Sequence, residues 1–487
     1  MMTPDEGSCR GVIPPLAAKI LNEIQVSIPA HPGFLKWESW DESLWRYVMF
    51  PCKYVPAALL AAALLFGSGS SNPHFAVGPT SALAQSSHSD QDWDHDYHHH
   101  ERGVTFLYPL PVPGTSATNP FSAFDIIFVK PRKQLMSFSS RSSKAVVLYD
   151  VFNDTPVGST APIFAGQGSN NPHSGPNGTL IAGHQLWAGD YPSTIRVFDL
   201  SVSISSPPEI AAIDTGGTLR ANEMDYDPKD HIVLVTNSND TPPFVNLVST
   251  KTLTITKQVV FDGTNGTVDA TVGGTGGVLY DSKTGKFLVA IPQVGSDVTK
   301  GAVVELDPIT GAVTHVFYGT DNCQAAGMAE GPGENVLVGC DPGFPPPATP
   351  SSGTAPDYVT FAPRTYVING RTGKIRATIT QVGGEDEVWY NPGDHHYYTG
   401  SRDFFTGTSP SAATPVLGVI DADTNQWIEN VPTGPNSHSV AANPLNDHIY
   451  VPLKNPNTLC GSLPGCIGVF RDVQHHDHDH DRDHDGK

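Results

Sequence analysis

The chain has 487 residues and a formal net charge of −21, with 47 glycines, 43 prolines and only 16% charged residues. This composition is typical of an all-β chain with many tight turns rather than of a helical one. The acidity argues against nucleic-acid binding, because a phosphate backbone would repel the chain and no basic patch offsets this charge.

The N-terminal region divides into two parts. Residues 1–48 contain no repeat and form an extension of unknown role. After Met49, Lys53 precedes the apolar run AALLAAALLF at 57–66, and the small residues at 81–84 offer a cleavage site. Residues 49–84 therefore resemble a secretory signal peptide, with a membrane anchor or a buried apolar segment as the alternatives. The run is shorter than the about 20 residues of a stable membrane span.

Two segments rich in His and Asp, 85–102 and 474–487, flank the central region, and we expect both to be disordered. Imidazoles interleaved with carboxylates bind Zn, Ni or Cu, although a flexible chain imposes no single geometry. A solvated acidic tail is the alternative interpretation. The residues predicted to chelate metal are His98, His99, His100, His475, His476, His478 and His480.

A repeated pattern fills residues 103–473: a polar start, alternating apolar residues, a turn and a second apolar strand. It is clearest in Gly434–Leu453. The turn residues are Pro131, Pro176, Pro228, Ser282, Pro332, Pro392 and Pro444. Self-similarity at about 40–50 residues with several short strands per unit predicts a β-propeller with one blade per unit. The turn residues therefore predict seven blades.

Each unit also contains a third strand, and most lead through a turn such as Asp307–Gly311 or Asn369–Gly373 into a fourth. The last unit ends at Asp472 without a fourth strand. Since a closed ring cannot leave that edge unpaired, we assign the missing strand to Gly103–Val112. The predicted fold is an all-β, seven-bladed propeller of four-stranded antiparallel blades, closed by an N-terminal strand that completes the last blade.

The segments His438-Ser-Val-Ala441, Ile449-Tyr-Val451 and Leu234-Val-Thr-Asn237 resemble the repeat of the YVTN β-propeller family. That pattern has a polar residue, Val-Ala, a Pro turn and then Tyr-Val-Thr-Asn. The resemblance covers roughly residues 103–473. It implies the propeller fold and often an exported location, but it does not imply one reaction.

The cysteines favour export. Cys323 and Cys340 flank the first two strands of blade five, and Cys460 and Cys466 bracket a tight loop in blade seven. We predict two disulfides, which form in oxidising compartments such as the periplasm or the extracellular space. Four free thiols are the alternative.

The residue six positions before each turn residue should lie at the mouth of the central channel. These residues are Asp125, Asn170, Asn222, Gly276, Ala326, Asp386 and His438, with Glu223 and Glu387 adjacent. Such a polar ring can simply line a water-filled channel. Alternatively, Asn170, Asp386 and Glu387 hold Ca²⁺ or Mg²⁺, with Glu223 and His438 as catalytic residues of a metal-dependent hydrolase or lactonase.

Three long segments are predicted to connect second and third strands on the same face: His184–Asp190, Asp341–Pro363 and Arg402–Pro415. Long loops at one rim usually shape a binding surface, although these can also cover blade edges. The residues predicted to contact a protein or small-molecule ligand are His184, Trp187, Asn222, Arg402, Asp403, Phe404 and Phe405.

These patterns predict an exported, monomeric propeller that works as a binding or scaffolding module with metal-chelating tails. The sequence contains no phosphate loop, no nucleophile elbow and no haem-attachment motif. Whether the protein is an enzyme stays open, with a hydrolase or lactonase at the channel mouth as the alternative function.

Overall fold

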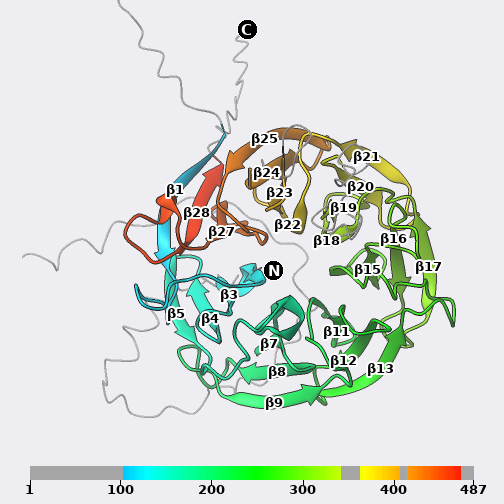
Figure 1. Cartoon of the computed structure of the whole chain (residues 1–487), viewed down its shortest axis with the longest axis horizontal. Coiled ribbons are helices and arrows are strands. Elements are labelled where there is room, and N and C mark those ends of the chain that lie inside the picture. Colours follow the sequence, from blue (N-terminus) through cyan, green and yellow to red (C-terminus); the bar gives the residue numbers. More distant parts are fainter. Residues whose placement is uncertain (1–102, 342–361, 406–413, 473–487) are drawn as a thin grey trace, which may run out of the picture. The chain divides into compact units, whose positions relative to one another are not determined.

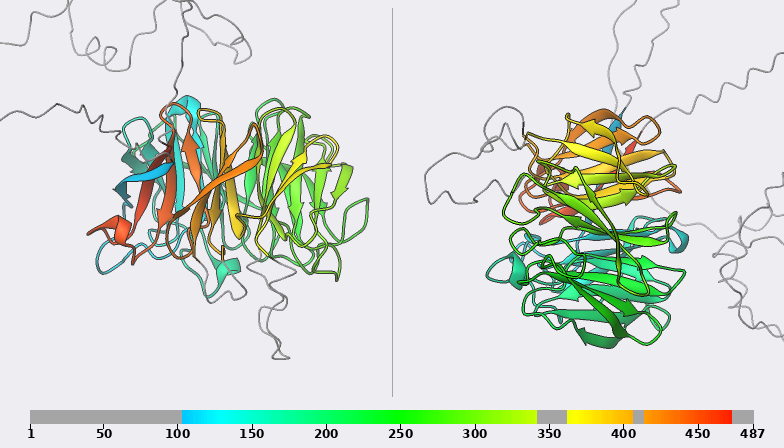
Figure 2. Two further views of the ribbon diagram at one scale, coloured as in Figure 1. Left: turned by 90° about the horizontal axis from the view of Figure 1, so that it is seen from above. Right: turned by 90° about the vertical axis from the view of Figure 1, so that its right-hand side faces the viewer.

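The computed structural model describes residues 103–341, 362–405 and 414–472. In these residues, seven four-stranded antiparallel sheets surround a central channel, as Figure 1 shows. Seen edge-on in Figure 2, the ring is a thick disc whose strand connections emerge on two faces. The predicted all-β, seven-bladed propeller is confirmed.

The first four blades follow each other along the chain, and each runs from its innermost to its outermost strand. Blade one contains β2 (Ile127–Lys130), β3 (Leu135–Ser140), β4 (Ala145–Asp150) and β5 (Thr155–Ser159). Blade two contains β6 (Thr179–Ala182), β7 (Gln185–Asp190), β8 (Thr194–Asp199) and β9 (Glu209–Asp214). Blade three contains β10 (Met224–Asp227), β11 (Ile232–Asn237), β12 (Phe244–Ser249) and β13 (Thr254–Val260). Blade four contains β14 (Val278–Asp281), β15 (Lys286–Ile291), β16 (Ala302–Leu306) and β17 (Val313–Tyr318).

The remaining three blades complete the ring. Blade five contains β18 (Ala325–Glu330), β19 (Asn335–Cys340), β20 (Thr365–Asn369) and β21 (Ile375–Ile379). Blade six contains β22 (Glu385–Asn391), β23 (His396–Ser401), β24 (Val416–Asp421) and β25 (Gln426–Pro432). Blade seven contains β26 (Ala441–Asn443), β27 (His448–Leu453), β28 (Cys466–Asp472) and, outermost, β1 (Val104–Pro111). We call the face where the innermost strands begin the upper face, and the opposite one the lower face.

Polar turn residues close the hairpins between third and fourth strands. The Asp307 carboxylate accepts hydrogen bonds from the backbone N–H groups of Ile309 and Thr310, and the Asn369 side chain accepts from the corresponding positions of its own turn. Gly311 follows with φ +69°, a left-handed conformation that suits glycine. The turn chemistry of the sequence therefore accounts for these hairpins.

Burial decreases from the middle strands to the rim. Every residue of β11 is buried, whereas β13 in the same blade is mostly exposed or half-buried. The reason is that each sheet packs both faces against neighbouring blades, while its outermost strand has solvent on one side. Within the described ranges, no helix has the length and apolarity that crossing a bilayer requires.

The first and last blades meet around the Asp154 carboxylate, which lies in the turn between β4 and β5. β1 pairs antiparallel with β28. Asp154 accepts hydrogen bonds from Tyr108 Oη of β1 at 2.6 Å and from Tyr450 Oη of β27 at 2.5 Å. His448 Nδ1, also on β27, lies 2.6 Å from the same carboxylate. One buried acid of blade one thus holds two strands of blade seven.

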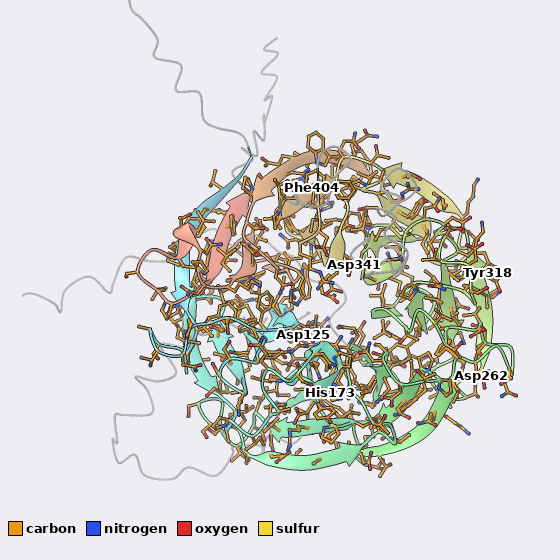
Figure 3. The ribbon with its side chains drawn as sticks, in the orientation of Figure 1. Asp125, His173, Asp262, Tyr318, Asp341 and Phe404 are labelled. Carbon is orange, nitrogen blue, oxygen red and sulfur yellow. A yellow bond between two sulfur atoms is a disulfide. The ribbon has the colours of Figure 1, made fainter. Side chains whose placement is uncertain are left out.

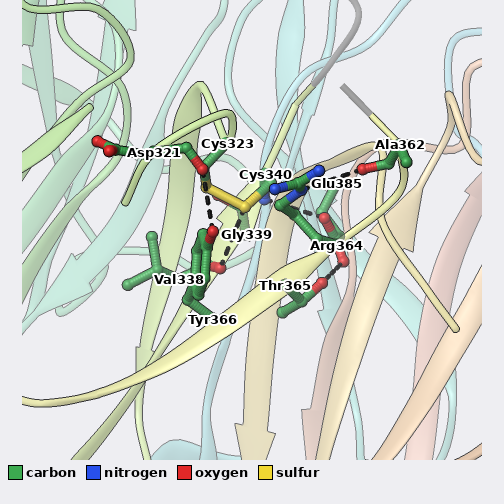
Figure 4. Close-up of a disulfide and its surroundings, with 10 residues drawn as sticks. All are labelled: Asp321, Cys323, Val338, Gly339, Cys340, Ala362, Arg364, Thr365, Tyr366 and Glu385. Carbon is green, nitrogen blue, oxygen red and sulfur yellow. Dashed lines mark hydrogen bonds between the residues drawn. A yellow bond between two sulfur atoms is a disulfide. The ribbon is translucent and has the colours of Figure 1, made fainter. Parts of the chain in front are cut away.

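Both predicted disulfides are present, joining Cys323 to Cys340 and Cys460 to Cys466. Figure 4 shows the first beside the fully buried Glu385, whose carboxylate accepts a hydrogen bond from the Cys340 N–H at 2.9 Å. The Thr365 hydroxyl donates to the same carboxylate. Burial raises the pKa of Glu385 to about 8. The disulfide and the hydrogen bond to Glu385 both hold Cys340, the last residue of β19. They therefore fix the position from which the chain continues to Asp341.

Blade two departs from the predicted register. Its hairpin turn lies at Gly183 and His184, between β6 and β7, and not at Pro176. Gly183 adopts φ +57°, so this blade makes its turn without a proline. His184 Nδ1 lies 3.4 Å from Nζ of Lys133, which belongs to the matching turn of blade one at the lower face. Trp187 is a fully buried residue of β7.

The expected contacts of His184 and Trp187 with a ligand at the upper rim are therefore wrong, because the segment His184–Asp190 is a turn followed by a core strand. The other two predicted insertions do connect second and third strands at the upper face. Residues 342–361 and 406–413 of these insertions lie outside the described part of the chain. Phe404 and Phe405 are buried, so their rings do not offer a rim surface.

Candidate functional site

The connections that enter the innermost strands bring polar side chains together at the upper mouth of the channel. Asp125 and Asp341 lie close to the channel in Figure 3, whereas Tyr318 and Asp262 lie at the outer rim. Two neighbouring cavities open here, of about 370 and 120 Å³. Asp125, Asn171 and Arg402 line both of them.

The predicted mouth ring is largely present around these cavities. The smaller cavity is lined by Asp125, Asn222, Glu223, Gly276, Ala326, Asp386 and Glu387, and the larger by Asp125, Asn170 and His438. The shifted register of blade two explains one difference. Asn177 occupies the ring position expected for Asn170, is fully buried, and accepts a hydrogen bond from Arg141 Nη2 at 2.7 Å.

Two buried arginines that the repeat analysis did not identify converge on Asp125. Arg141 Nη2 lies 2.6 Å and Arg220 Nη1 3.2 Å from Asp125 Oδ2. Both guanidinium groups also donate to the Asn171 carboxamide oxygen, at 2.8 and 3.0 Å. Burial alone would raise the pKa of Asp125, but the two arginines hold it well below its usual range. Asp125 is therefore an ionised anchor for two cations.

His438 completes this cluster from blade seven. Its Nδ1 donates to the Asn436 carbonyl at 2.8 Å, and its Nε2 lies 3.4 Å from Asp125 Oδ1. The ring stacks on Phe124, with centroids 4.4 Å apart and planes inclined by 9°. Both nitrogens of His438 thus already face a partner.

Arg402 forms a second charged cluster on the blade-five and blade-six side of the mouth. Its guanidinium lies 2.6 Å from Asp341, 2.8 Å from Asp386 and 3.1 Å from Asp403. Asp341 directly follows the disulfide-bonded Cys340, which fixes its position. The structure places the predicted residues Arg402 and Asp403 at the upper mouth, but Arg402 is engaged with three carboxylates.

Deeper in the channel, Glu223 and Glu387 share a hydrogen bond. Burial and the nearby carboxylates of Asp125 and Asp386 raise the pKa of Glu223 to about 8. Burial and the charge of Glu223 raise the pKa of Glu387 well above its usual value. Because the two carboxyls lie against each other, one proton between them avoids placing two like charges side by side.

The three side chains predicted to hold a channel metal are engaged with different partners. Asp386 pairs with Arg402, Glu387 with Glu223, and the Asn170 carboxamide with the His173 ring. In the part of the chain that the structure describes, no group of three His, Cys, Asp or Glu side chains is placed to hold a metal ion. These residues do not fit a Ca²⁺ or Mg²⁺ centre as arranged, so we derive no reaction step through one. The seven tail histidines predicted to chelate metal lie outside the described residues.

The sequence carried only a weak signal for the residues that the repeat analysis missed. Arg141 stands in the Ser-rich turn 139–143, and Arg220 in the connection between β9 and β10. An isolated arginine in a short turn of an acidic chain suggests an ion pair. Only the ring geometry shows that the two pair with the same carboxylate, because they lie on different blades.

Comparison with protein-family models and with curated proteins found no match. Among solved structures, the chain is similar to Kuenenia stuttgartiensis hydrazine synthase, at 15% sequence identity and a TM-score of 0.50. The similarity covers 70% of this chain and 94% of that chain. At this identity the likeness supports the β-propeller fold alone. The resemblance to the YVTN-repeat family stays a prediction.

Proposed function

We propose that the chain is an exported binding protein whose ligand site is the larger cavity at the upper mouth of the channel. The observation that carries this proposal is the volume of about 370 Å³ walled by Asp125, Arg141, Arg402, His438 and Lys454. Small-molecule sites in proteins are usually about 300–1,000 Å³ and combine a preformed wall with a few placed polar groups. The ion pairs described above preform this wall.

The charges around the cavity favour a ligand with a carboxylate or phosphate group. Arg141 and Arg402 are held in place by acidic partners, and each guanidinium keeps a donor that those partners do not use. Lys454 lines the same cavity and forms no ion pair within residues 103–341, 362–405 and 414–472. An anionic group would supply this ammonium with a charge-assisted hydrogen bond.

Titration calorimetry of the purified chain with succinate and with inorganic phosphate tests the proposal. We expect at least one of them to bind, and Lys454→Gln to weaken binding about 10- to 100-fold, since a hydrogen bond to a charged group contributes about 1.5–3 kcal/mol. Lys229→Gln is the matched control, because Lys229 is exposed in the lower-face turn between β10 and β11. Equal affinity of the parent and Lys454→Gln would place the ligand elsewhere.

Export and metal chelation belong to the same proposal. The two disulfides are compatible with an oxidising compartment outside the cytosol. The His and Asp residues of 85–102 and 474–487 supply ligand types suited to Zn, Ni or Cu. Cell fractionation and mass determination of the mature N-terminus test export, with cleavage expected after residue 84.

A hydrolytic function is the second candidate, and the raised pKa of Glu223 favours it. A carboxyl group with a pKa of about 8 is mostly protonated at pH 7 and is able to act as a general acid. If the chain hydrolyses a lactone or ester, Glu223→Gln should abolish turnover while the fold is retained. A role for His438 as general base would require the ring to leave the partners of its two nitrogens.

A further inference from the structure

A separate cavity of about 220 Å³ lies lower in the channel, and residues from all seven blades contribute to its wall. Glu223 and Glu387 line this cavity as well as the smaller one at the upper mouth. Gly277 also lines both cavities, and most of the other residues of the lower wall lie further along the innermost strands. It is therefore a distinct compartment below the carboxyl pair.

Aromatic rings form one side of this lower cavity. Phe128, Trp389 and Tyr390 line it, from β2 and β22. Phe128 and Trp389 meet edge to face, with centroids 5.8 Å apart and planes at 77°. Trp389 is only partly buried, and it also packs against buried residues of neighbouring blades. The thioether side chains of Met224 and Met328 add to the apolar wall.

The lower cavity differs from the larger cavity at the upper mouth in the charge of its lining residues. Its acidic residues are Glu223, Asp225, Glu330 and Glu387, and no Lys or Arg is among the described residues that line it. Asp225 accepts hydrogen bonds from the backbone N–H groups of Tyr280 at 2.6 Å and Tyr226 at 2.7 Å. The cations near these acids lie outside the lining: Lys283 Nζ is 3.4 Å from Glu330, Lys130 acts electrostatically on Asp225, and Arg141 and Arg220 act on Glu223.

We propose that the lower cavity binds a small organic ammonium ion. Aromatic faces attract cations through their ring quadrupole, and the attraction is stronger where water is excluded. The carboxylates of Asp225 and Glu330 at the same wall add a direct electrostatic attraction, and they repel anions. The alkyl groups of an organic cation also remove apolar ring and thioether surface from water. The combination of rings, thioethers and carboxylates therefore suits an alkylated ammonium better than a neutral or anionic molecule.

Choline and its neutral carbon analogue 3,3-dimethylbutan-1-ol provide the test, because they differ mainly in charge. Binding to the full mature chain would be measured by titration calorimetry. We expect choline to bind at least tenfold more tightly than the alcohol. Trp389→Leu should weaken choline binding at least tenfold, and the isosteric Glu330→Gln, which removes a charged lining group, should weaken it measurably. Trp427→Leu is the matched control, since Trp427 is 38% exposed on the outermost strand β25.

Three results would overturn the proposal: no choline binding to the parent chain, equal binding of choline and the alcohol, or full retention of binding in Glu330→Gln and Trp389→Leu. Circular dichroism of each variant shows whether it has folded. If Trp389→Leu fails to fold, Glu330→Gln decides alone, because an amide occupies the volume of the carboxyl group. Loss of choline binding in Trp427→Leu would also contradict the assignment, since that side chain lies at the rim.

Discussion

Replacing Asp154 with Asn should loosen the junction between the first and last blades. The carboxylate accepts from Tyr108 and Tyr450 and contacts the His448 ring, at distances of 2.5–2.6 Å. A hydrogen bond to a charged group contributes about 1.5–3 kcal/mol and a neutral one about 0.5–1.5 kcal/mol. Replacing the charged acceptor with a neutral one should weaken each of the three contacts by about 1 kcal/mol. The free energy of unfolding should therefore fall by about 3 kcal/mol. Asn is suitable here because Asp154 has φ +49°, which Asn tolerates.

Urea denaturation of the parent and the variant measures this loss as a midpoint shift at constant slope. Asp150→Asn is the matched control, because the Asp150 side chain bonds only to residues of its own turn. The His448 and tyrosine hydrogen bonds lower the pKa of Asp154 against the effect of burial. Its contribution is therefore complete above pH ~4 and lost as the pH falls further. A difference below about 0.5 kcal/mol at pH 7 would refute the assigned role.

Three further predictions concern other parts of the chain. His396 lies 2.8 Å from Asp472, which raises its pKa despite burial, so its stabilising effect should be complete below pH ~6.5 and lost as the pH rises further. Denaturation of His396→Gln across this range should show a flatter pH dependence than the parent. Replacing Cys323 and Cys340 with Ser should cost about 3 kcal/mol, more than removing the shorter-range second disulfide, as measured by urea denaturation. Replacing the seven tail histidines predicted to chelate metal with Ala should remove bound Zn or Ni after dialysis, as measured by elemental analysis.

The repeat pattern was sufficient for most of the fold because each blade carries its own local signals. Turns such as Asp307–Gly311 bind their own backbone, and buried strands such as β15 are almost continuously apolar. Blade two differs from the predicted register because its turn is at Gly183, whereas the proline of the repeat pattern, Pro176, lies seven residues earlier. Because the predicted turn position is shifted in this blade, the core residue Trp187 falls in a predicted loop, although it lies in β7.

The candidate site was only partly predictable. Asp125 and His438 lie at a position that repeats in every blade, so counting along the sequence found them. Arg141 and Arg220 lie in connections of different lengths, and no periodicity links them to Asp125. Arg141 lies 16 positions from Asp125, but only the arrangement of the blades in a ring brings Arg220, 95 positions away, within 3.2 Å of the same carboxylate.

The sequence by itself determined the blade count, the hairpin turns and the cysteine pairs, because these depend on short-range periodicity and local hydrogen bonds. Only the tertiary structure decided which carboxyls carry charge. Asp125 is held ionised by two arginines from different blades, whereas Glu223 and Glu387 face each other and raise each other's pKa. Charge in a buried channel depends on neighbours across the ring, and those neighbours are far apart in the chain.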